Sequence, residues 1–373
     1  MKKLMILTAV LSAGAAGAFA QGRGFGAGET PSALRSVPAE TTAAKVKDPN
    51  WKAPRTAWGQ PDLSGIWTSD DMRGVPATRP AAQKDRESLT PEEFLRRARG
   101  DEASRDRAVN QETVLRNEFG VRTFGYTSFV VDPPDGQLPA LTPAGQAKQR
   151  ATFGVGTFGG GPWNDFSNFT LYDRCITRGI AGIFPVLYGN GLRIMQTPNE
   201  VIISYEMIHD TRVIYTDGRP HVGPKIEQYL GNSIGHWEGD TLVVETTNFT
   251  DLVGAFNGPN SDKLKVTERF TRIDPDMIDY RIRVEDPVMY TAPFTIRYTI
   301  THQPDYKLYE YSCHEGNGAV RNALAGERAY DREVAAAIKA GKPIPTRAPT
   351  GMEVYTGQNV EGREAVREFG TGR

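Results

Sequence analysis

Short runs of alternating apolar and polar residues, separated by turn residues, dominate the chain from residue 172 to residue 313. Alternation with a period of two over such short runs predicts β-strands. In residues 201–205, β-branched and aromatic side chains predominate, as strands prefer. The predicted strands cover residues 193–197, 201–208, 211–216, 241–247, 264–273, 277–284, 294–301 and 307–313.

The connections between most of these strands are short and carry turn residues, as in 274–276 and 303–305. Short connections favour antiparallel neighbours, because parallel pairing needs long crossovers. Closure of such a meander removes the exposed sheet edges. We therefore predict a mainly β fold, in which an antiparallel meander closes into a lipocalin-like barrel or barrel-like sheet with peripheral helices. A β-sandwich is the alternative.

The tripeptide Gly65-Ile66-Trp67 resembles the first-strand signature of lipocalin-like barrels. In those barrels the Trp closes one end and the Gly permits close backbone approach; a buried Trp beside a turn is the alternative. Helices are predicted from Thr90, where Glu93 completes a capping box, from Thr142 to about Arg150, and over Arg321–Ala340.

The first residues have the pattern of a secretory signal peptide. Lys2 and Lys3 precede the apolar stretch 4–11, and Ala18-Phe19-Ala20 is a small-x-small cleavage site. No later stretch is apolar for long enough to span a bilayer, so no transmembrane segment is expected. The sequence thus predicts a periplasmic or secreted protein.

The predicted organisation has four parts. Residues 1–20 form the signal peptide, and residues 21–49 form a Gly-, Ala- and Pro-rich disordered arm. Residues 50–340 form a single β-rich domain with a helical insertion at 80–150, and residues 341–373 form an extended tail.

The net charge of the chain does not favour nucleic acid or an anionic membrane as the leading candidate for a partner. The chain has 44 basic and 45 acidic residues, and loss of Lys2 and Lys3 with the signal peptide leaves 42 against 45, or −3. This near-balance provides no electrostatic footprint for nucleic acid or for an anionic membrane. We therefore expect a small organic ligand or substrate and no nucleic-acid partner.

The chain has two cysteines, Cys175 and Cys313. In an oxidising compartment they are expected to form one long-range disulfide. The alternative is a catalytic thiol at Cys313, beside His314.

Five polar residues interrupt the predicted sheet where Val or Ile would be usual: Tyr205, Glu206, His209, Asp210 and Arg212. As a catalytic site, His209 would act as general acid or base, oriented by Glu206 or Asp210. Arg212 would hold an anionic or carbonyl group of the ligand, and Tyr205 would line the pocket. The alternative is a buried hydrogen-bonded network that joins two strands.

Other residues are candidates for ligand binding. If Cys175 bridges Cys313, then Arg174 and Arg178 approach His314, and the arginines could bind a carboxylate or phosphate. Trp237 is the expected aromatic contribution to the pocket lining.

No cofactor is predicted, and a metal ion has no support. Glu206-x-x-His209 has the spacing of a helical metal site, but these positions point to opposite faces of a strand, so a metal site would need a bend in the chain, for which His209-Asp210 is the candidate. The G-x-G-x-x-G match at 154–159 follows a helix-like segment, whereas a dinucleotide site needs a strand before it and a helix after it.

Five segments resemble a large group of secreted bacterial proteins whose activity is uncharacterised: VVDPPDGQLPALTPAG, RCITRGI, YEMIHDTRVIYTDGRPH, GHWEGDTLVVETTNF and YEYSCHEGN. The resemblance covers roughly residues 50–330 and implies a secreted, β-rich single module. It implies no activity for particular residues.

The first hypothesis for function is a secreted small-molecule-binding β-barrel protein, because barrels of this size hold a small ligand in the mouth. The alternative is a cofactor-independent enzyme (a hydrolase, lyase or isomerase) that uses His209, Glu206, Asp210 and Arg212. A third hypothesis, an envelope or matrix interaction protein, predicts an exposed apolar patch in place of a pocket.

Overall fold

The computed structural model describes residues 50–72, 74–83, 86–110, 120, 122–153, 163–180, 189–254, 258–302 and 306–346. The predicted signal peptide (1–20), the predicted arm (21–49), the glycine motif at 154–159 and residues 347–373 of the predicted tail lie outside this part of the chain.

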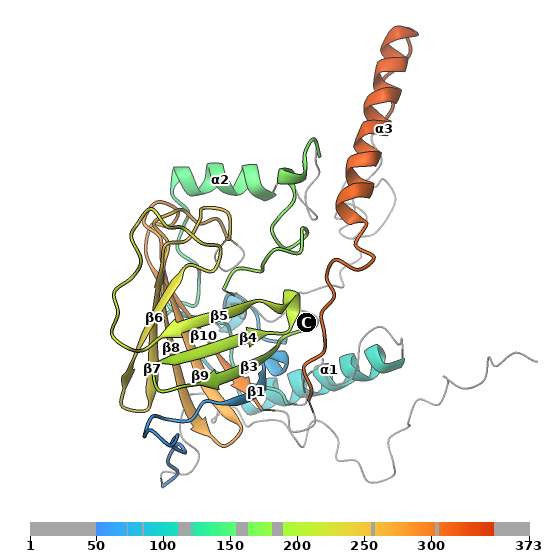
Figure 1. Ribbon diagram of the computed structural model, residues 1–373. Helices are drawn as coiled ribbons and strands as arrows, with labels where there is room; N and C mark the ends of the chain where they lie inside the picture. Colours follow the sequence, from blue (N-terminus) through green and yellow to red (C-terminus); the bar gives the residue numbers. More distant parts are fainter. Residues whose placement is uncertain are drawn as a thin grey trace, which may run out of the picture.

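In the described residues, nine strands close into a barrel, and a tenth strand pairs outside it (Figure 1). The barrel order is β1-β3-β4-β5-β6-β7-β8-β9-β10, and the pairing of Thr68 with Thr301 closes it. The outside strand β2 (Val130–Asp132) pairs with β10. The barrel strands are β1 (Gly65–Thr68), β3 (Gly191–Gln196), β4 (Glu200–Tyr205), β5 (Thr211–Tyr215), β6 (Asn232–Glu238), β7 (Thr241–Thr247), β8 (Lys265–Asp274), β9 (Met277–Glu285) and β10 (Phe294–Thr301). The prediction of a mainly β fold that closes into a barrel is confirmed.

Two details differ from the predicted meander. Strand β6 was not among the predicted strands; it pairs parallel to β5, since residues 216–231 run back along the barrel before β6 begins. Residues 307–313 were predicted as a strand but form no strand. Their backbone is engaged elsewhere: the amide of Tyr309 donates to the side chain of Glu206.

Trp67 fills the end of the barrel near the start of β1. It is 1% exposed, and its Nε1 donates to the carbonyl oxygen of Leu63 at 3.0 Å. The guanidinium of Arg272 lies 5.3 Å from the ring centroid. Gly65 has φ +143°, and a Cβ there would lie 3.2 Å from Trp67 Nε1, so the close approach of this backbone requires glycine.

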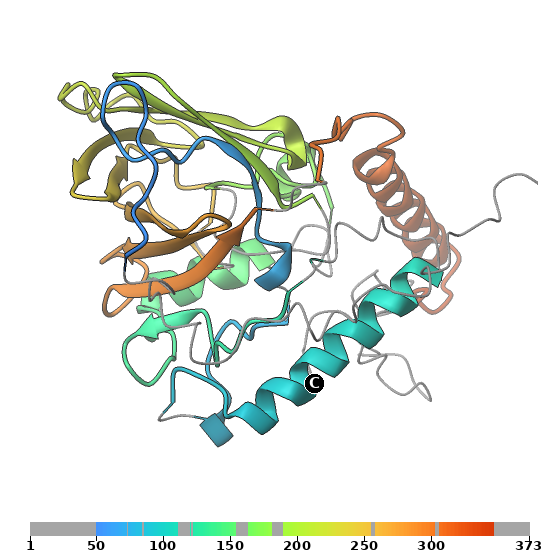
Figure 2. The same ribbon diagram turned by 90° about the horizontal axis from the view of Figure 1, so that it is seen from below.

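Three α-helices are present in the described residues: α1 (Pro91–Asn110), α2 (Pro143–Phe153) and α3 (Ala319–Lys339). The predicted capping box of α1 forms, because the Thr90 amide donates to Glu93 at 2.8 Å and the Glu93 amide donates to Thr90 Oγ1 at 3.3 Å. Helix α2 lies across one end of the barrel, whereas α1 and α3 lie to one side (Figures 1 and 2). In the described part of the chain, no helix combines the length and apolarity needed to cross a membrane.

Candidate functional site

The turn between β4 and β5 has an unusual backbone. It forms a 3-10 turn, Met207–His209, in which Ile208 has φ 61° and His209 has φ 49°. Residues other than glycine seldom adopt this left-handed conformation, least of all β-branched ones. The side chains of Met207 and Ile208 are buried and hold the turn in place, while His209 is exposed. Strain of this kind is often found at binding sites.

A cavity of about 460 Å³ opens beside this turn, on the outer face of the barrel wall. We call it the His209 pocket. Its floor is Arg193 and Met195 of β3 with Ser204 of β4, and its end is formed by residues 205, 206 and 209. Residues 308–312, here called the wall segment, close the opposite side.

The strand register explains the floor. Arg193 lies opposite Ser204, and Ser204 lies opposite Thr211, so these side chains form a row across the outer face. The hydroxyls of Ser204 and Thr211 are 2.7 Å apart and hydrogen-bonded. The row leaves the Arg193 guanidinium at the edge of the pocket.

Glu206 anchors the wall segment to the barrel. Its carboxylate is buried and accepts hydrogen bonds from the Tyr306 hydroxyl at 2.9 and 3.0 Å and from the Tyr309 amide at 3.2 Å. The approach is close: a Cβ on Gly191 would lie 2.7 Å from both Leu308 Cδ2 and Tyr306 Cε1. The absence of a side chain at Gly191 thus lets this segment pack onto β3.

His209 presents one ring nitrogen to the pocket. Its Nδ1 lies 3.3 Å from the carbonyl oxygen of Tyr311. Because a carbonyl only accepts, Nδ1 carries the proton in the neutral ring and Nε2 keeps its lone pair. His209 can therefore accept a hydrogen bond or a proton from a bound molecule.

The carboxylate of Asp210 is engaged by the loop at residues 177–178. It accepts a hydrogen bond from Thr177 Oγ1 at 2.6 Å and another from the backbone N–H of Arg178. Burial raises the pKa of Asp210 above its ordinary value of 3.8, and these two hydrogen bonds partly oppose the rise. Asp210 thus fixes the turn against the loop at residues 177–178 and does not line the pocket.

Arg212 lies inside the barrel, on the other side of the wall from the pocket. It is 3% exposed and donates to Glu268, which is 0% exposed, at 2.6 and 2.9 Å. Tyr280 donates its hydroxyl to the same carboxylate. Alternation along β5 puts Thr211 outward and Arg212 inward, so the Arg212 side chain does not line the His209 pocket.

Tyr205 lies between the His209 pocket and the interior of the barrel. It borders the His209 pocket, and burial raises the pKa of its hydroxyl to about 12. The nearby positive charge of Arg212 lowers that pKa, but by less than burial raises it. Burial raises the pKa of the Tyr298 hydroxyl well above its ordinary value, and the positive charge of Arg178 opposes part of that rise.

The disulfide between Cys175 and Cys313 is present, as predicted, and joins residues 138 positions apart. Cys313 directly follows the wall segment, and Cys175 lies two residues before Thr177. The bond therefore ties the wall segment to the loop that holds Asp210. His314 is exposed beyond the pocket, so the predicted approach of the arginines to His314 does not create a shared site with His209.

The two remaining candidates lie elsewhere. The Arg174 guanidinium sits 5.0 Å from the ring centroid of Phe166. Trp237 lies far from the level of Arg212 along the barrel. Ile214 is two residues after Arg212 on β5 and pairs with Ser233 of the parallel strand β6. Trp237 lies four residues after Ser233 on β6. Six residues correspond to about 20 Å along a strand. Trp237 packs against the barrel core instead.

Sequence reasoning missed Arg193, Met195 and the tyrosines of the wall segment. The available signal was Met195, an apolar residue at a position that the alternation of β3 points outward, where it is 38% exposed. Tyr309 is likewise 47% exposed. Large apolar side chains that share one exposed site indicate a binding surface.

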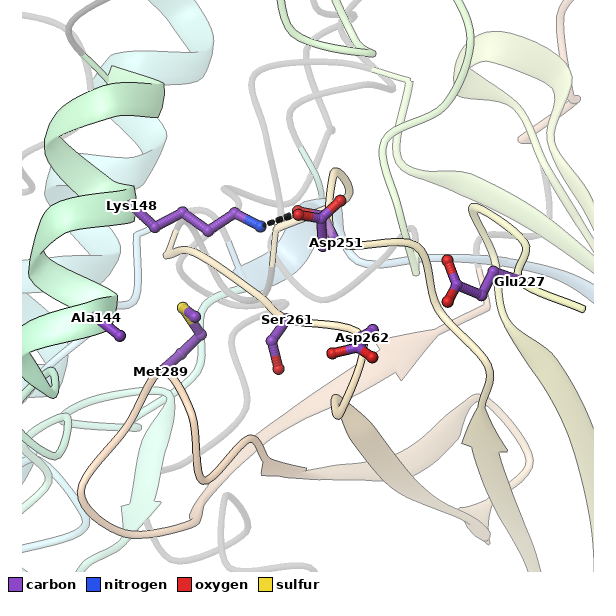
Figure 3. A pocket seen from close by; sticks show the side chains of 7 residues that line it. All are labelled: Ala144, Lys148, Glu227, Asp251, Ser261, Asp262 and Met289. Carbon is purple, nitrogen blue, oxygen red and sulfur yellow. Dashed lines mark hydrogen bonds and ion pairs between the residues drawn. The ribbon is translucent and has the colours of Figure 1, made fainter. Parts of the chain in front are cut away.

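A second cavity, of about 520 Å³, lies between α2 and the loops at one end of the barrel (Figure 3). Lys148 of α2 pairs with Asp251 across it at 2.8 Å, and Asp262 pairs with Lys263 at 2.6 Å. Only the Lys148–Asp251 pair joins α2 to a loop of the barrel, and the other charged residues of the lining, Glu227 and Asp262, are acidic.

Within the described residues, no group of three His, Cys, Asp or Glu side chains is placed to hold a metal ion. Comparison with protein-family models, with curated proteins and with solved structures finds no match to this chain. Its function is therefore inferred from the geometry of the His209 pocket.

Proposed function

We propose that this chain is an exported small-molecule-binding β-barrel protein whose ligand occupies the His209 pocket. The observation that carries the proposal is the composition of this pocket. Exposed apolar side chains, Met195 and Tyr309, lie beside polar groups available for a ligand, the Arg193 guanidinium and His209 Nε2. A concave apolar surface with a few convergent polar groups is typical of ligand sites.

The pocket has the rigidity that binding requires. Its floor is a paired sheet, and its wall is held by the hydrogen bonds to Glu206 and by the disulfide at Cys313. A preformed site avoids the entropic cost of ordering loops around the ligand. Each 100 Å² of apolar surface that a ligand covers would contribute about 2.5 kcal/mol before the costs of association are subtracted.

Export is part of the proposal. Disulfides persist in oxidising compartments and are rare in the cytosol, so the bond between Cys175 and Cys313 supports a periplasmic or secreted location. The signal-peptide pattern of residues 1–20 and the resemblance to secreted bacterial proteins point to the same location.

A second candidate function is a cofactor-independent enzyme at the same pocket. The hydrogen bond from His209 Nδ1 to the Tyr311 carbonyl favours it, because this bond leaves Nε2 as a base. Arg212 is paired with Glu268 inside the barrel, so Arg193 would have to stabilise developing negative charge in its place.

The test compares two tryptophan substitutions. Ser204→Trp fills the pocket floor, whereas Thr267→Trp adds the same bulk on the outward face of β8, away from the pocket. Saturation-transfer NMR with a library of small organic molecules should detect binders for the wild type and for Thr267→Trp, and these binders should be lost in Ser204→Trp. Binders that persist in Ser204→Trp would refute the assignment of the pocket.

His209→Gln then separates the two candidate functions. A binding protein should lose only part of its affinity, because the rest of the pocket remains. An enzyme should lose turnover of the identified ligand by about 100-fold or more, as expected for removal of a general base.

A further inference from the structure

The His209 pocket carries charges of both signs that do not pair. Arg193 is on the floor and Glu310 is on the wall segment, and both are exposed. Within the described part of the chain, neither side chain forms an ion pair or a hydrogen bond, with the other or with any third residue. A bound molecule could therefore engage each of them without breaking an existing contact.

The positive and the negative side chains of the His209 pocket lie on different elements of the fold. The single positive side chain of the lining, Arg193, is on β3, whereas Glu310 and the buried Glu206 are on the wall segment and at the turn. Glu206 is held by Tyr306 and Tyr309, but its negative charge still acts on the same side as Glu310. The pocket thus favours a ligand that carries both a negative and a positive group.

The uncharged groups of the pocket favour the same placement of the positive and negative groups of a ligand. His209 Nε2 has a lone pair at the turn, so it favours a hydrogen-bond donor there rather than a carboxylate. Tyr309 offers an exposed ring beside Glu310, and an ammonium group is attracted to the face of such a ring. Met195 and Leu308 line the same pocket and offer apolar contact to a body that carries the two charged groups.

We propose, on the basis of the function above, that the ligand is a zwitterion with an apolar or aromatic body, of the chemical class of a free aromatic amino acid. Its carboxylate pairs with the guanidinium of Arg193. Its ammonium group lies between His209 Nε2 and Glu310, and its side chain covers Met195 and Tyr309. A ligand with only a carboxylate would pair with Arg193 but be repelled by Glu310. A ligand with only an ammonium group would pair with Glu310 but be repelled by Arg193.

The experiment uses three molecules that share one body: L-phenylalanine, 3-phenylpropionate, which lacks the amino group, and 2-phenylethylamine, which lacks the carboxylate. Their affinities for the full chain are measured by isothermal titration calorimetry. L-phenylalanine should bind roughly tenfold or more tightly than either singly charged analogue, since each removes one charge-assisted contact.

Two variants test which pocket residue contacts each charged group of the ligand. Arg193→Met should weaken L-phenylalanine by roughly tenfold and leave 2-phenylethylamine as tight or tighter. Glu310→Gln should weaken L-phenylalanine and strengthen 3-phenylpropionate. Arg332→Met, at an exposed position of α3, is the matched control and should change none of the three affinities.

Equal affinities for the three molecules would overturn the zwitterion while leaving the pocket as a binding site. Absence of binding by L-phenylalanine, L-tyrosine and L-tryptophan would overturn it as well. In that case, the comparison of Ser204→Trp with Thr267→Trp still decides whether the pocket binds any molecule, so the two failures are distinguishable.

Discussion

Arg212 and Glu268 form a two-fold hydrogen-bonded ion pair inside the barrel, with Nη1–Oε2 at 2.6 Å and Nη2–Oε1 at 2.9 Å. Glu268 raises the pKa of Arg212, and the guanidinium stays charged. The pair crosses from β5 to β8 and therefore links two strands that are not neighbours in the sheet. It belongs to the interior of the barrel, whereas the His209 pocket lies outside the wall.

Removal of one partner of this pair should be strongly destabilising. Glu268→Ala leaves the Arg212 charge buried and unpaired, which costs about 3–5 kcal/mol. Arg212→Met combined with Glu268→Leu should restore much of the loss, since an apolar pair of similar volume fills the same space. Urea unfolding of the three proteins measures the differences. A loss for Glu268→Ala below about 1 kcal/mol would contradict a buried, dry ion pair.

The disulfide should support both stability and binding. Replacing Cys175 and Cys313 by Ala removes a cross-link over 138 positions, which the chain-entropy relation equates with about 5 kcal/mol. The variant should also bind ligand more weakly, because the wall segment ends at Cys313. Urea unfolding and titration of any identified ligand measure the two effects. Unchanged affinity in a folded variant would show that Glu206 alone holds the wall segment.

Gly191→Ala should disturb the pocket specifically. The new Cβ would lie 2.7 Å from Leu308 and Tyr306, so the wall segment must move or the strand must shift. We expect a loss of about 1–3 kcal/mol and weaker ligand binding. Gly223→Ala is the matched control, because a Cβ there meets nothing within 4 Å. Equal thermal stability and affinity for both variants would refute the tight approach at Gly191.

The raised pKa of Asp210 predicts how the free energy of unfolding changes with pH. Burial raises the pKa of its carboxyl above 3.8, so the folded state binds the proton more tightly than the unfolded state does. This group therefore makes stability fall as pH rises from about 3.8 through the raised pKa. Asp210→Asn should remove that fall, so the stability of the variant relative to the wild type should increase with pH across this window.

Thermal unfolding of both proteins between about pH 3.5 and pH 7 tests this expectation. Asp331→Asn, at an exposed position of α3, controls for the loss of a charge. A relative stability of Asp210→Asn that decreases as pH rises would mean that Thr177 and the Arg178 amide stabilise the carboxylate more than burial opposes it.

The strands that the sequence predicted best have the clearest alternation. Along β8 and β9, residues such as Val266 and Ile282 face inward and charged residues alternate with them. The strand β6 was missed because Gly235 and His236 interrupt its apolar pattern. Its parallel pairing with β5 depends on the path of residues 216–231, which local pattern does not determine.

The candidate site could be predicted only in part. The cluster of polar residues near Tyr205 located the turn, and Glu206 and His209 do lie at one pocket. The face of each side chain depends on where the strand ends: β5 begins at Thr211, which turns Arg212 inward. The contribution of the wall segment follows from the disulfide and from the contacts of Glu206, which connect residues about 100 positions apart.

The most direct test of the His209 pocket is a long-range 1H–15N NMR spectrum of the imidazoles, recorded at about pH 8 with and without L-phenylalanine. His209 should have its proton on Nδ1, and ligand should shift its Nε2 signal. His236, which is 65% exposed and lies 3.1 Å from Glu238, should not shift. Ring signals of His209 that stay unchanged at saturating concentrations of every ligand that binds would contradict the pocket as the binding site.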